Sequence, residues 1–285
     1  MEIKKIVAAY FSPTGNTEKL AKAMAAAVTD AAGAVEIPVE VLDFTRPEAR
    51  DRQYTFARND LLIIGLPVYA GRLPNKILPF VQENLKGNDT ISLPFVCFGN
   101  RAFDDGIAEL VYEQKNTGFR PVAAAAFATQ HAFATELAHG RPDAADLEDA
   151  KAFARGVWGK INRAEDTDAD GVFFGDLAVD GNTPPGPYYR PKRMDGEPAV
   201  FLKAKPLTDT EKCVGCGTCA RVCCMGSIDP SDVISVPGIC IKCQACVTHC
   251  PVGAKYFDDP DFLSHREMLE SNFREEKKNR FWRSW

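Results

Sequence analysis

The chain has 285 residues, of which 45% are hydrophobic and 26% charged, a composition that excludes a largely disordered protein. Its net charge of −5 gives no electrostatic reason to expect nucleic acid as a partner, and no apolar run is long enough to span a bilayer. The apolar stretch in residues 1–11 is too short for a signal peptide, so we expect a strand there and a cytoplasmic protein.

Short apolar runs alternate with stretches of helical periodicity over residues 1–165. The runs predicted to be strands are 3–11, 35–44, 60–66, 91–98 and 121–129. The predicted helices lie around 20–28 and at 77–85, 106–116 and 144–163. This alternation predicts a doubly wound α/β fold with a five-stranded parallel sheet. Ligands of such sheets bind beyond the carboxyl ends of the strands, so the loops after the first, third and fourth strands are the first candidates for a site.

The rest of the chain divides into three predicted segments. Residues 166–206 are rich in proline and glycine and are predicted to form a linker or an extended crossing segment. Residues 207–260 hold most of the cysteines, and residues 261–285 are predicted to form a charged helical tail. The basic and aromatic residues of the tail leave two interpretations open. One is a surface for RNA or anionic lipid, and the other, which we favour, is packing against the two domains.

Nine of the ten cysteines lie in residues 213–250. They contain a C-x2-C-x2-C-x3-C motif that occurs twice with an offset of 27 residues. In a reducing compartment such a cluster indicates metal binding or catalysis rather than disulfides. Zinc sites usually pair two C-x2-C motifs across a long gap, so the spacing favours iron–sulfur clusters over zinc.

The repeated motif resembles that of bacterial two-cluster ferredoxins, in which the fourth cysteine of each motif ligates the other cluster. The resemblance implies two [4Fe–4S] clusters. Their implied ligands are Cys213, Cys216, Cys219 and Cys250 for one cluster, and Cys240, Cys243, Cys246 and Cys223 for the other. Pro251 follows the second motif as in that family, but Cys224 follows the first, which leaves Cys223 or Cys224 as the ligand. The repeat favours Cys223 and makes Cys224 a spare buried thiol.

The loop after the first predicted strand is typical of a phosphate site. Its hydroxyls and its glycine stand at the start of a helix, where unpaired amides and the helix dipole favour an anion. No lysine follows the glycine, so nucleotide hydrolysis is not expected. The loop resembles the FMN-phosphate loop of flavodoxins, which implies contacts from Ser12, Thr14, Gly15, Asn16 and Thr17. An ordinary capped helix is the alternative.

Two further loops resemble the flavin-ring loops of flavodoxins. The residues implied to contact the ring are Pro67, Val68, Tyr69, Ala70 and Gly71 in the first loop, and Phe98, Gly99, Asn100, Arg101, Phe103 and Asp104 in the second. Tyr69 is predicted to stack on the ring, with Phe98 or Phe103 as the second ring partner. The Ala70–Gly71 peptide is predicted to hydrogen-bond flavin N5 and to reorient when N5 is protonated. Arg72 and Arg101 are expected either to stabilise reduced, anionic flavin and attract an anionic substrate, or to be solvated surface charges.

Together, these loops and the cysteine motifs resemble the flavodoxin–ferredoxin fusion proteins of anaerobic bacteria over nearly the whole chain. The resemblance implies a flavodoxin-like domain with strand order 2-1-3-4-5, followed by a small α+β two-cluster ferredoxin-like domain. It implies FMN and two [4Fe–4S] clusters as cofactors, and electron transfer with a redox protein as the function. No G-x-G-x-x-G fingerprint is present, so direct oxidation of NAD(P)H is not expected.

An FMN-dependent reductase of a small molecule, supplied with electrons by the clusters, is the alternative function. Its candidate catalytic residues are Tyr69, Arg101 and His131, and together with Arg72 they are expected to line an open pocket over the flavin ring. His131 is a candidate proton donor because histidine titrates near neutrality, although a structural role is more common. His249, between two predicted ligands, is expected to form a hydrogen bond beside a cluster.

Overall fold

A mostly parallel sheet forms the core of the N-terminal half of the chain in the computed structural model, which describes residues 2–33, 36–163 and 174–285. Its five parallel strands are β1 (Lys5–Tyr10), β2 (Val39–Asp43), β4 (Asp60–Pro67), β6 (Thr90–Phe98) and β8 (Ala123–Ala128). They lie in the order β2-β1-β4-β6-β8. This is the 2-1-3-4-5 order of the flavodoxin-like doubly wound fold, so the predicted fold class is confirmed.

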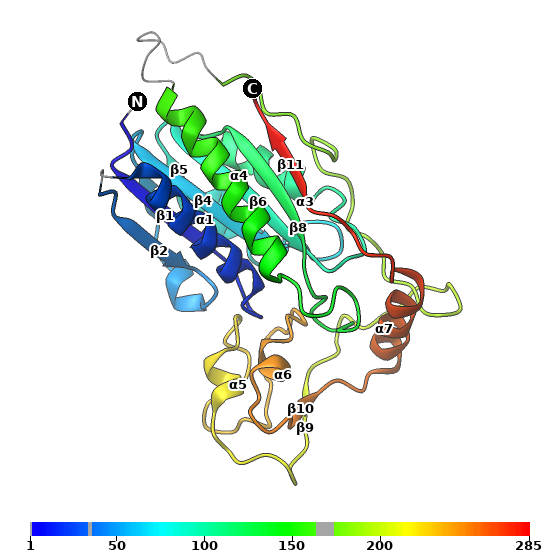
Figure 1. Cartoon of the computed structure of the whole chain (residues 1–285). Helices are drawn as coiled ribbons and strands as arrows, with labels where there is room; N and C mark the ends of the chain where they lie inside the picture. Colours follow the sequence, from blue (N-terminus) through cyan, green and yellow to red (C-terminus); the bar gives the residue numbers. More distant parts are fainter. Residues whose placement is uncertain (1, 34–35, 164–173) are drawn as a thin grey trace.

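Helices cover both faces of this sheet (Figure 1). On one face α1 (Asn16–Ala32) packs against α4 (Ala144–Arg163), and on the other α2 (Leu78–Glu83) packs against α3 (Gly106–Asn116). The central strands β6 and β8 are buried along their whole length, and β4 along nearly all of it. Burial on both faces explains why these strands are continuous apolar runs in the sequence rather than alternating ones.

The predicted bounds of the elements agree best with the observed bounds for the helices. The helices expected at 106–116 and 144–163 have the bounds of α3 and α4. The strand expected over 35–44 begins only at Val39, after Pro38, which has no N–H to pair. Residue 35 and the predicted domain boundary at residue 165 lie outside the described residues.

The sheet is larger than the five strands predicted. β7 (Phe119–Pro121) pairs with β6, and β11 (Arg280–Arg283) pairs antiparallel with β8 at the edge. Outside this sheet, β3 (Tyr54–Phe56) pairs with β5 (Leu85–Gly87), and a 3₁₀ helix, η1, spans Pro47–Arg50. The prediction therefore misses β7, which is parallel to β6, the antiparallel edge strand β11 and the separate β3–β5 pair.

The predicted helical tail is helical only in its first half. α7 (Pro260–Asn272) begins after Asp259, whose carboxylate accepts a hydrogen bond from the Phe262 N–H (2.9 Å). The chain then extends into β11, so the helix prediction is wrong for the second half. The reason is that Phe281 and Trp282 pack into the cores on opposite faces of the sheet, as alternate residues of a strand do. The tail thus packs against the sheet, as we favoured.

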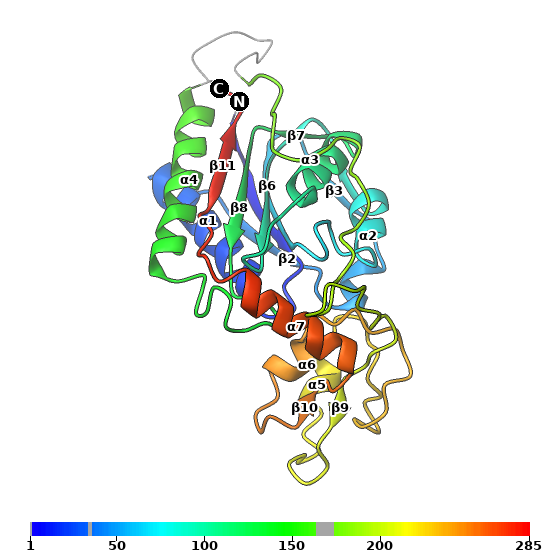
Figure 2. The same cartoon turned by 90° about the vertical axis from the view of Figure 1, so that its right-hand side faces the viewer.

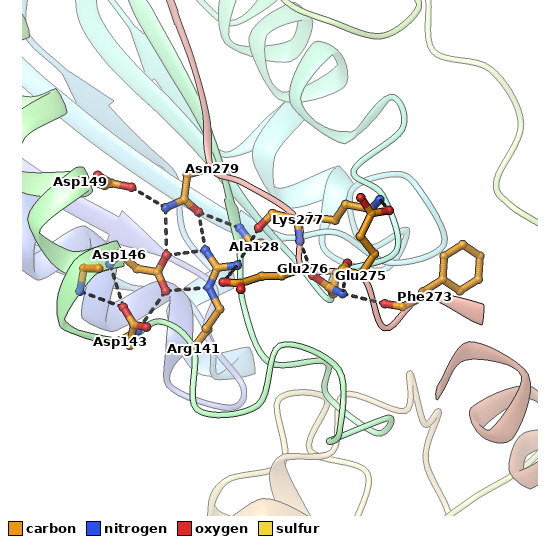
Figure 3. Close-up of polar contacts among 12 residues, drawn as sticks. Ala128, Arg141, Asp143, Asp146, Asp149, Phe273, Glu275, Glu276, Lys277 and Asn279 are labelled. Atoms are coloured by element: carbon orange, nitrogen blue, oxygen red, sulfur yellow. Dashed lines mark hydrogen bonds and ion pairs between the residues drawn. The ribbon is translucent and has the colours of Figure 1, made fainter. Parts of the chain in front are cut away.

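Polar contacts fix the connection between α7 and β11 (Figure 3). The Asn279 side chain accepts a hydrogen bond from the Ala128 N–H (3.1 Å) and donates to Asp146 and Asp149 (both 2.9 Å). Asn100, in the loop after β6, donates to two main-chain carbonyls of the connection (2.7 and 3.0 Å) and accepts from one of its N–H groups (3.0 Å). These contacts hold the C-terminal segment beside the carboxyl ends of the strands.

A small domain with the nine clustered cysteines lies beyond the carboxyl ends of the strands (Figure 1). A left-handed residue precedes each of its short helices, Gly217 (φ 70°) and Gln244 (φ 66°), and the two positions are related by the 27-residue offset of the motif. The backbone therefore repeats as the cysteine spacing does. The elements of this domain are β9 (Leu207–Thr208), α5 (Thr218–Arg221), α6 (Ala245–Thr248) and β10 (Lys255–Tyr256), with β9 antiparallel to β10.

Residues 174–206, which we call the crossing segment, run along the first domain (Figure 2) and form neither a helix nor a strand. Asp105, just before α3, accepts hydrogen bonds from the N–H groups of Asn182 (2.8 Å) and Gly186 (2.7 Å). The Tyr188 hydroxyl donates to the Leu73 carbonyl (2.9 Å). These contacts hold the segment against the loops at the carboxyl ends of the strands.

Candidate functional site

The cysteines of the small domain line two separate cavities. One, of about 350 Å³, is lined by Cys223, Cys224, Cys240, Cys243 and Cys246. The other, of about 300 Å³, is lined by Cys213, Cys216, Cys219 and Cys250. In each cavity, three cysteines of one motif meet the fourth cysteine of the other motif. This exchange of cysteines is the arrangement that the ferredoxin resemblance implies. We call the cavity that contains Cys243 the inner cavity and the cavity that contains Cys216 the outer cavity.

Cys223 and Cys250 occupy equivalent places in the repeat. The Cys223 thiol accepts a hydrogen bond from the N–H of Ser227 (3.2 Å), and the Cys250 thiol accepts one from Ala254 (3.2 Å), also four residues on. Cys224 has a different environment, because its sulfur lies 3.3 Å from the sulfur of Cys243. The repeat therefore supports Cys223, rather than Cys224, as the counterpart of Cys250.

The cysteine thiols of the small domain are arranged to hold a group larger than a single metal ion. All ten cysteines are free of disulfides. Across residues 2–33, 36–163 and 174–285, no group of three or more His, Cys, Asp or Glu side chains is placed to hold a single metal ion. Zinc requires its ligands to converge on one ion. The two cavities lined by four or five thiols therefore suit a multi-iron cluster better than zinc.

The loop before α1 presents unpaired amides at the start of the helix. Gly15 has a left-handed conformation (φ 89°) that turns the chain into α1. The Ser12 hydroxyl accepts a hydrogen bond from the Glu18 N–H (3.0 Å), but the N–H groups of Asn16 and Thr17 have no acceptor within the described chain. Donors that a helix N-terminus leaves unpaired, beside Thr14, form a suitable site for a phosphate.

A large cavity extends from this loop across the carboxyl ends of the strands. It encloses about 1070 Å³, including the part open to solvent. It brings together ten of the residues predicted to bind the flavin or to act in catalysis. These are Thr14, Asn16, Thr17, Pro67, Val68, Tyr69, Ala70, Gly99, Arg101 and His131. We refer to it as the flavin cavity.

The loop after β4 is a tight turn that the crossing segment holds. Tyr69 and Arg72 exchange main-chain hydrogen bonds (2.8 and 3.2 Å) around Ala70 and Gly71, both with positive φ. The Ala70 carbonyl accepts a hydrogen bond from the Tyr189 N–H (2.8 Å). The predicted reorientation of the Ala70–Gly71 peptide would have to break this contact.

Arg72 does not line the flavin cavity. Its guanidinium pairs with the buried carboxylate of Glu109 (2.9 Å from Nε to Oε2) and lies 4.8 Å from the centre of the Tyr188 ring. The expectation that Arg72 lines the pocket over the ring is therefore wrong, and so is the alternative that it is a solvated surface charge. It is a structural ion pair, and its partner lies too far along the sequence to be recognised from the pattern.

The two predicted aromatic ring partners also lie elsewhere. Phe98 packs edge-on against Phe103 (5.3 Å between ring centres), and Phe103 packs against Trp282 of β11 (5.7 Å). The prediction that Phe98 or Phe103 stacks on the flavin is therefore not supported, because neither ring lines the flavin cavity and each packs against another aromatic ring. Of the other predicted contacts, Ser12, Gly15, Gly71, Asn100 and Asp104 belong to the loops around the cavity but do not line it.

His131 lines the flavin cavity as a neutral side chain. Burial lowers the pKa of His131 to about 3, with smaller contributions from His265 and Arg101. Its Nδ1 accepts hydrogen bonds from the N–H groups of Phe133 (3.3 Å) and Ala134 (3.1 Å), which assigns the proton to Nε2. The expectation that this histidine titrates near neutrality is wrong. It can still donate a hydrogen bond from Nε2.

We predict that acidification will destabilise the wild-type protein more than a His131→Asn variant, in which the amide oxygen can replace Nδ1 as acceptor. Because the native pKa (about 3) lies below that of the unfolded chain, unfolding takes up a proton at low pH. Between pH 7.5 and 5.5 this uptake removes about 1.4 kcal/mol from the stability of the wild type only. Anaerobic unfolding at both pH values measures it, and equal losses in the two proteins would contradict the neutral assignment.

Gly99 makes room for His131. A Cβ atom at position 99 would lie 2.3 Å from Cδ2 of His131. We predict that Gly99→Ala will displace the imidazole and weaken flavin binding about tenfold or more, since a misplaced ring enters the cavity. Flavin titration of the variant measures this. Gly156→Ala is the matched control because a Cβ there meets nothing within 4 Å; equal affinities in the two variants would contradict the assignment.

The outer side of the flavin cavity is formed by segments that the sequence did not indicate. Tyr189, Phe201 and His265, from the crossing segment and α7, line it. The guanidinium of Arg101 lies 4.1 Å from the centre of the Tyr189 ring, and His265 stacks on Phe201 (5.5 Å). The feature of the sequence that could have indicated this side of the cavity is the Tyr188–Tyr189 pair within a proline-rich stretch. These residues would cover a bound flavin that flavodoxin loops alone leave exposed at one edge.

The inner and flavin cavities share a boundary. Cys243 lines both of them, and Ile241 and Lys242 line the flavin cavity beside it. Burial raises the pKa of Tyr69 well above its usual value, and Cys243 is the next largest cause. Tyr69, in the loop after β4, is therefore close enough to Cys243 to interact with its charge.

Two contacts fix the small domain against the sheet domain. Arg50 of η1 donates to the Cys224 carbonyl (2.6 Å), next to the inner cavity. His249 donates from Nε2 to the Pro13 carbonyl in the phosphate loop (3.2 Å). The expectation that His249 bonds beside a cluster is therefore corrected: its ring joins the domains.

Comparison with known proteins identifies part of this arrangement. A family model described as a 4Fe-4S binding domain matches residues 206–223, which contain the first cysteine motif. The chain therefore contains a 4Fe–4S binding domain. No curated protein matches the chain.

Several solved structures are similar to the first domain. One is a flavodoxin from the domain Archaea, with 15% identity over 55% of this chain and 99% of that chain (TM-score 0.41). A second is the two-electron reduced flavodoxin of Megasphaera elsdenii, with 18% identity over 53% of this chain and 98% of that chain (TM-score 0.32). A third is rubredoxin oxygen:oxidoreductase from the anaerobe Desulfovibrio gigas, with 16% identity over 57% of this chain and 37% of that chain (TM-score 0.38).

Among the described helices, none combines the length and the apolar character needed to cross a membrane.

Proposed function

We propose that this chain is an iron–sulfur flavoprotein that transfers electrons between two [4Fe–4S] clusters and FMN. The observation that carries the proposal is the position of Cys243, which lines both the inner cavity and the flavin cavity. A cluster ligand at this boundary would bring the inner cluster next to the flavin site. Joining both in one chain makes the electron transfer intramolecular and independent of protein concentration.

The residues around the flavin cavity fit FMN. The unpaired N–H groups of Asn16 and Thr17 and the hydroxyl of Thr14 would hold its phosphate. Tyr69 would contact the ring, and Arg101 and the Nε2–H of His131 would donate to its polar edge. No carboxylate from the described residues lines the cavity, so nothing there repels an anionic cofactor.

FMN, when bound, exchanges one or two electrons, whereas each cluster carries one. Apolar and cationic side chains both line the site. Phe201 and Leu269 line its outer side, and Lys242, whose ammonium donates to the carbonyls of Leu202 and Cys240, lines it beside Cys243. Burial of the ring would disfavour negative charge on it, whereas the nearby cations Arg101 and Lys242 would favour that charge.

We further propose that a redox protein exchanges electrons with the chain at the outer cavity. Cys216 is exposed there, and Val214, which also lines this cavity, is 66% exposed. The flavin cavity, by contrast, is covered by the crossing segment and α7. Electrons from a large partner would therefore enter or leave through the outer cluster.

A reductase of a small molecule is the second candidate function. The flavin cavity contains all three candidate catalytic residues, Tyr69, Arg101 and His131. The crossing segment and α7 cover its outer side only in part, so a small molecule, unlike a large protein, could still enter through the part open to solvent. Turnover of small unsaturated acceptors by the reduced protein would favour this function, and reaction with redox proteins alone would favour the first.

Anaerobic purification followed by iron, sulfide and flavin analysis tests the proposal. We expect two clusters and one non-covalent FMN per chain, with the overlapping absorbance of both cofactor types. Zinc in place of iron, or a flavin-free protein that does not bind added FMN, would contradict it.

A further inference from the structure

Cys224 is the one cysteine of the small domain that the repeat does not account for. It stands at the position where the second motif has Pro251. Its side chain is buried (1% exposed), and its thiol donates a hydrogen bond to the sulfur of Cys243 at 3.3 Å. The inner cavity is therefore bordered by a fifth thiol, in contact with the ligand at the flavin boundary.

The first domain holds this thiol in place. Arg50 donates through Nη2 to the Cys224 carbonyl (2.6 Å) and through Nη1 to the carbonyls of Phe44 (2.8 Å) and Thr45 (2.7 Å). One guanidinium thus ties the backbone at Cys224 to the end of the sheet. The orientation of the Cys224 thiol is set by the contact between the domains.

The repeat provides an internal comparison for Cys224. In both cavities, the fourth cysteine of a motif accepts a hydrogen bond from the N–H group four residues later. Only the inner cavity has an added S–H donor, because proline at the equivalent position has neither a thiol nor an N–H. The outer cavity has a hydroxyl partner instead, since Cys216 Sγ lies 3.4 Å from Thr218 Oγ1. The two clusters would therefore differ in the kind of donor beside their ligands, although their ligand spacing is the same.

We propose that the Cys224 thiol is a positioning group that raises the reduction potential of the inner cluster by donating a hydrogen bond to Cys243. The inference rests on the proposed function, since it requires the inner cluster. Reduction adds negative charge to the ligand sulfurs, so a donor stabilises the reduced cluster more than the oxidised one. The thiol would thus favour an electron on the inner cluster, beside the flavin cavity.

Anaerobic redox titration of the holoprotein, followed by EPR of the two clusters, tests this role. In Cys224→Ala we expect full iron, sulfide and FMN, and a several-fold lower ratio of reduced to oxidised inner cluster at the same ambient potential. Cys224→Ser, which keeps a donor, should restore part of the ratio. Pro251→Ala, at the equivalent position beside the outer cluster, should leave the inner ratio unchanged.

Two results would overturn the proposal about Cys224. Neither of them would contradict the proposed electron-transfer function. If Cys224→Ala keeps both clusters and titrates as the wild type does, the thiol has no such effect. If it loses half its iron, Cys224 is a ligand rather than a donor. Cys224→Val fills the site without a donor and replaces the alanine variant if that variant does not fold. A wild-type protein without two clusters would instead reject the proposed function.

Discussion

A Cys243→Ala variant is expected to keep its FMN and lose about half of its iron and sulfide. Cys243 lines the inner cavity together with Cys223, Cys240 and Cys246, and removal of one of these four implied thiolate ligands weakens the attachment of the inner cluster. The flavin cavity loses only one of many lining residues, so FMN affinity should change little. Iron, sulfide and flavin analysis of the purified variant measures all three.

The same variant should also stop the reduction of FMN through the clusters. Its matched control is Cys216→Ala, which should lose a similar amount of iron from the outer cavity but keep the inner cluster beside the flavin cavity. A small reductant should therefore still reach the flavin through the inner cluster in the control. Full iron content in Cys243→Ala, or equal flavin reduction rates in the two variants, would show that the inner cavity has been misassigned.

Thr14→Ala combined with Thr17→Ala is expected to weaken FMN binding about 100-fold or more. Both residues line the flavin cavity at the start of α1, where their hydroxyls would donate to the phosphate. Hydrogen bonds to charged groups contribute about 1.5–3 kcal/mol each. The iron content should not change, because neither residue lines a cysteine cavity. Titration of the flavin-free variant with FMN, followed by fluorescence quenching, gives the dissociation constant.

Thr29→Ala provides the control for this pair. Thr29 lies on the same helix, α1, but its hydroxyl donates to the Ala25 carbonyl (3.1 Å), away from the flavin cavity. Wild-type affinity is expected for this variant. If the double variant binds FMN as tightly as Thr29→Ala does, the phosphate is not held by the loop before α1.

The sequence was most informative where the signal is local. Periodicity placed α3 and α4 at their observed bounds, because their apolar positions repeat along one face. The cysteine spacing likewise indicated which thiols gather, since a repeated motif with short gaps leaves few arrangements. The loop Ser12–Thr17 could be recognised because its residues act within a single turn of chain.

The parts of the fold and of the site that the sequence did not predict depend on contacts between residues that are distant in the sequence. Arg72 forms an ion pair with Glu109, and no local pattern distinguishes that pairing from a cation in the flavin cavity. β11 is a strand because its alternating aromatic residues complete both cores beside β8, whose small side chains leave them room. The outer side of the flavin cavity, with Tyr189 and His265, is formed only when the crossing segment and α7 fold over the strand ends.

Rapid mixing of the anaerobic, oxidised holoprotein with a limiting amount of a one-electron reductant tests the central claim most directly. If the clusters and FMN exchange electrons across the boundary at Cys243, the iron–sulfur absorbance should bleach first and then recover as the flavin is reduced. The second phase should be first order, with a rate that does not change when the protein is diluted tenfold. A second phase that slows in proportion to dilution, or clusters that stay reduced beside oxidised flavin, would contradict the account.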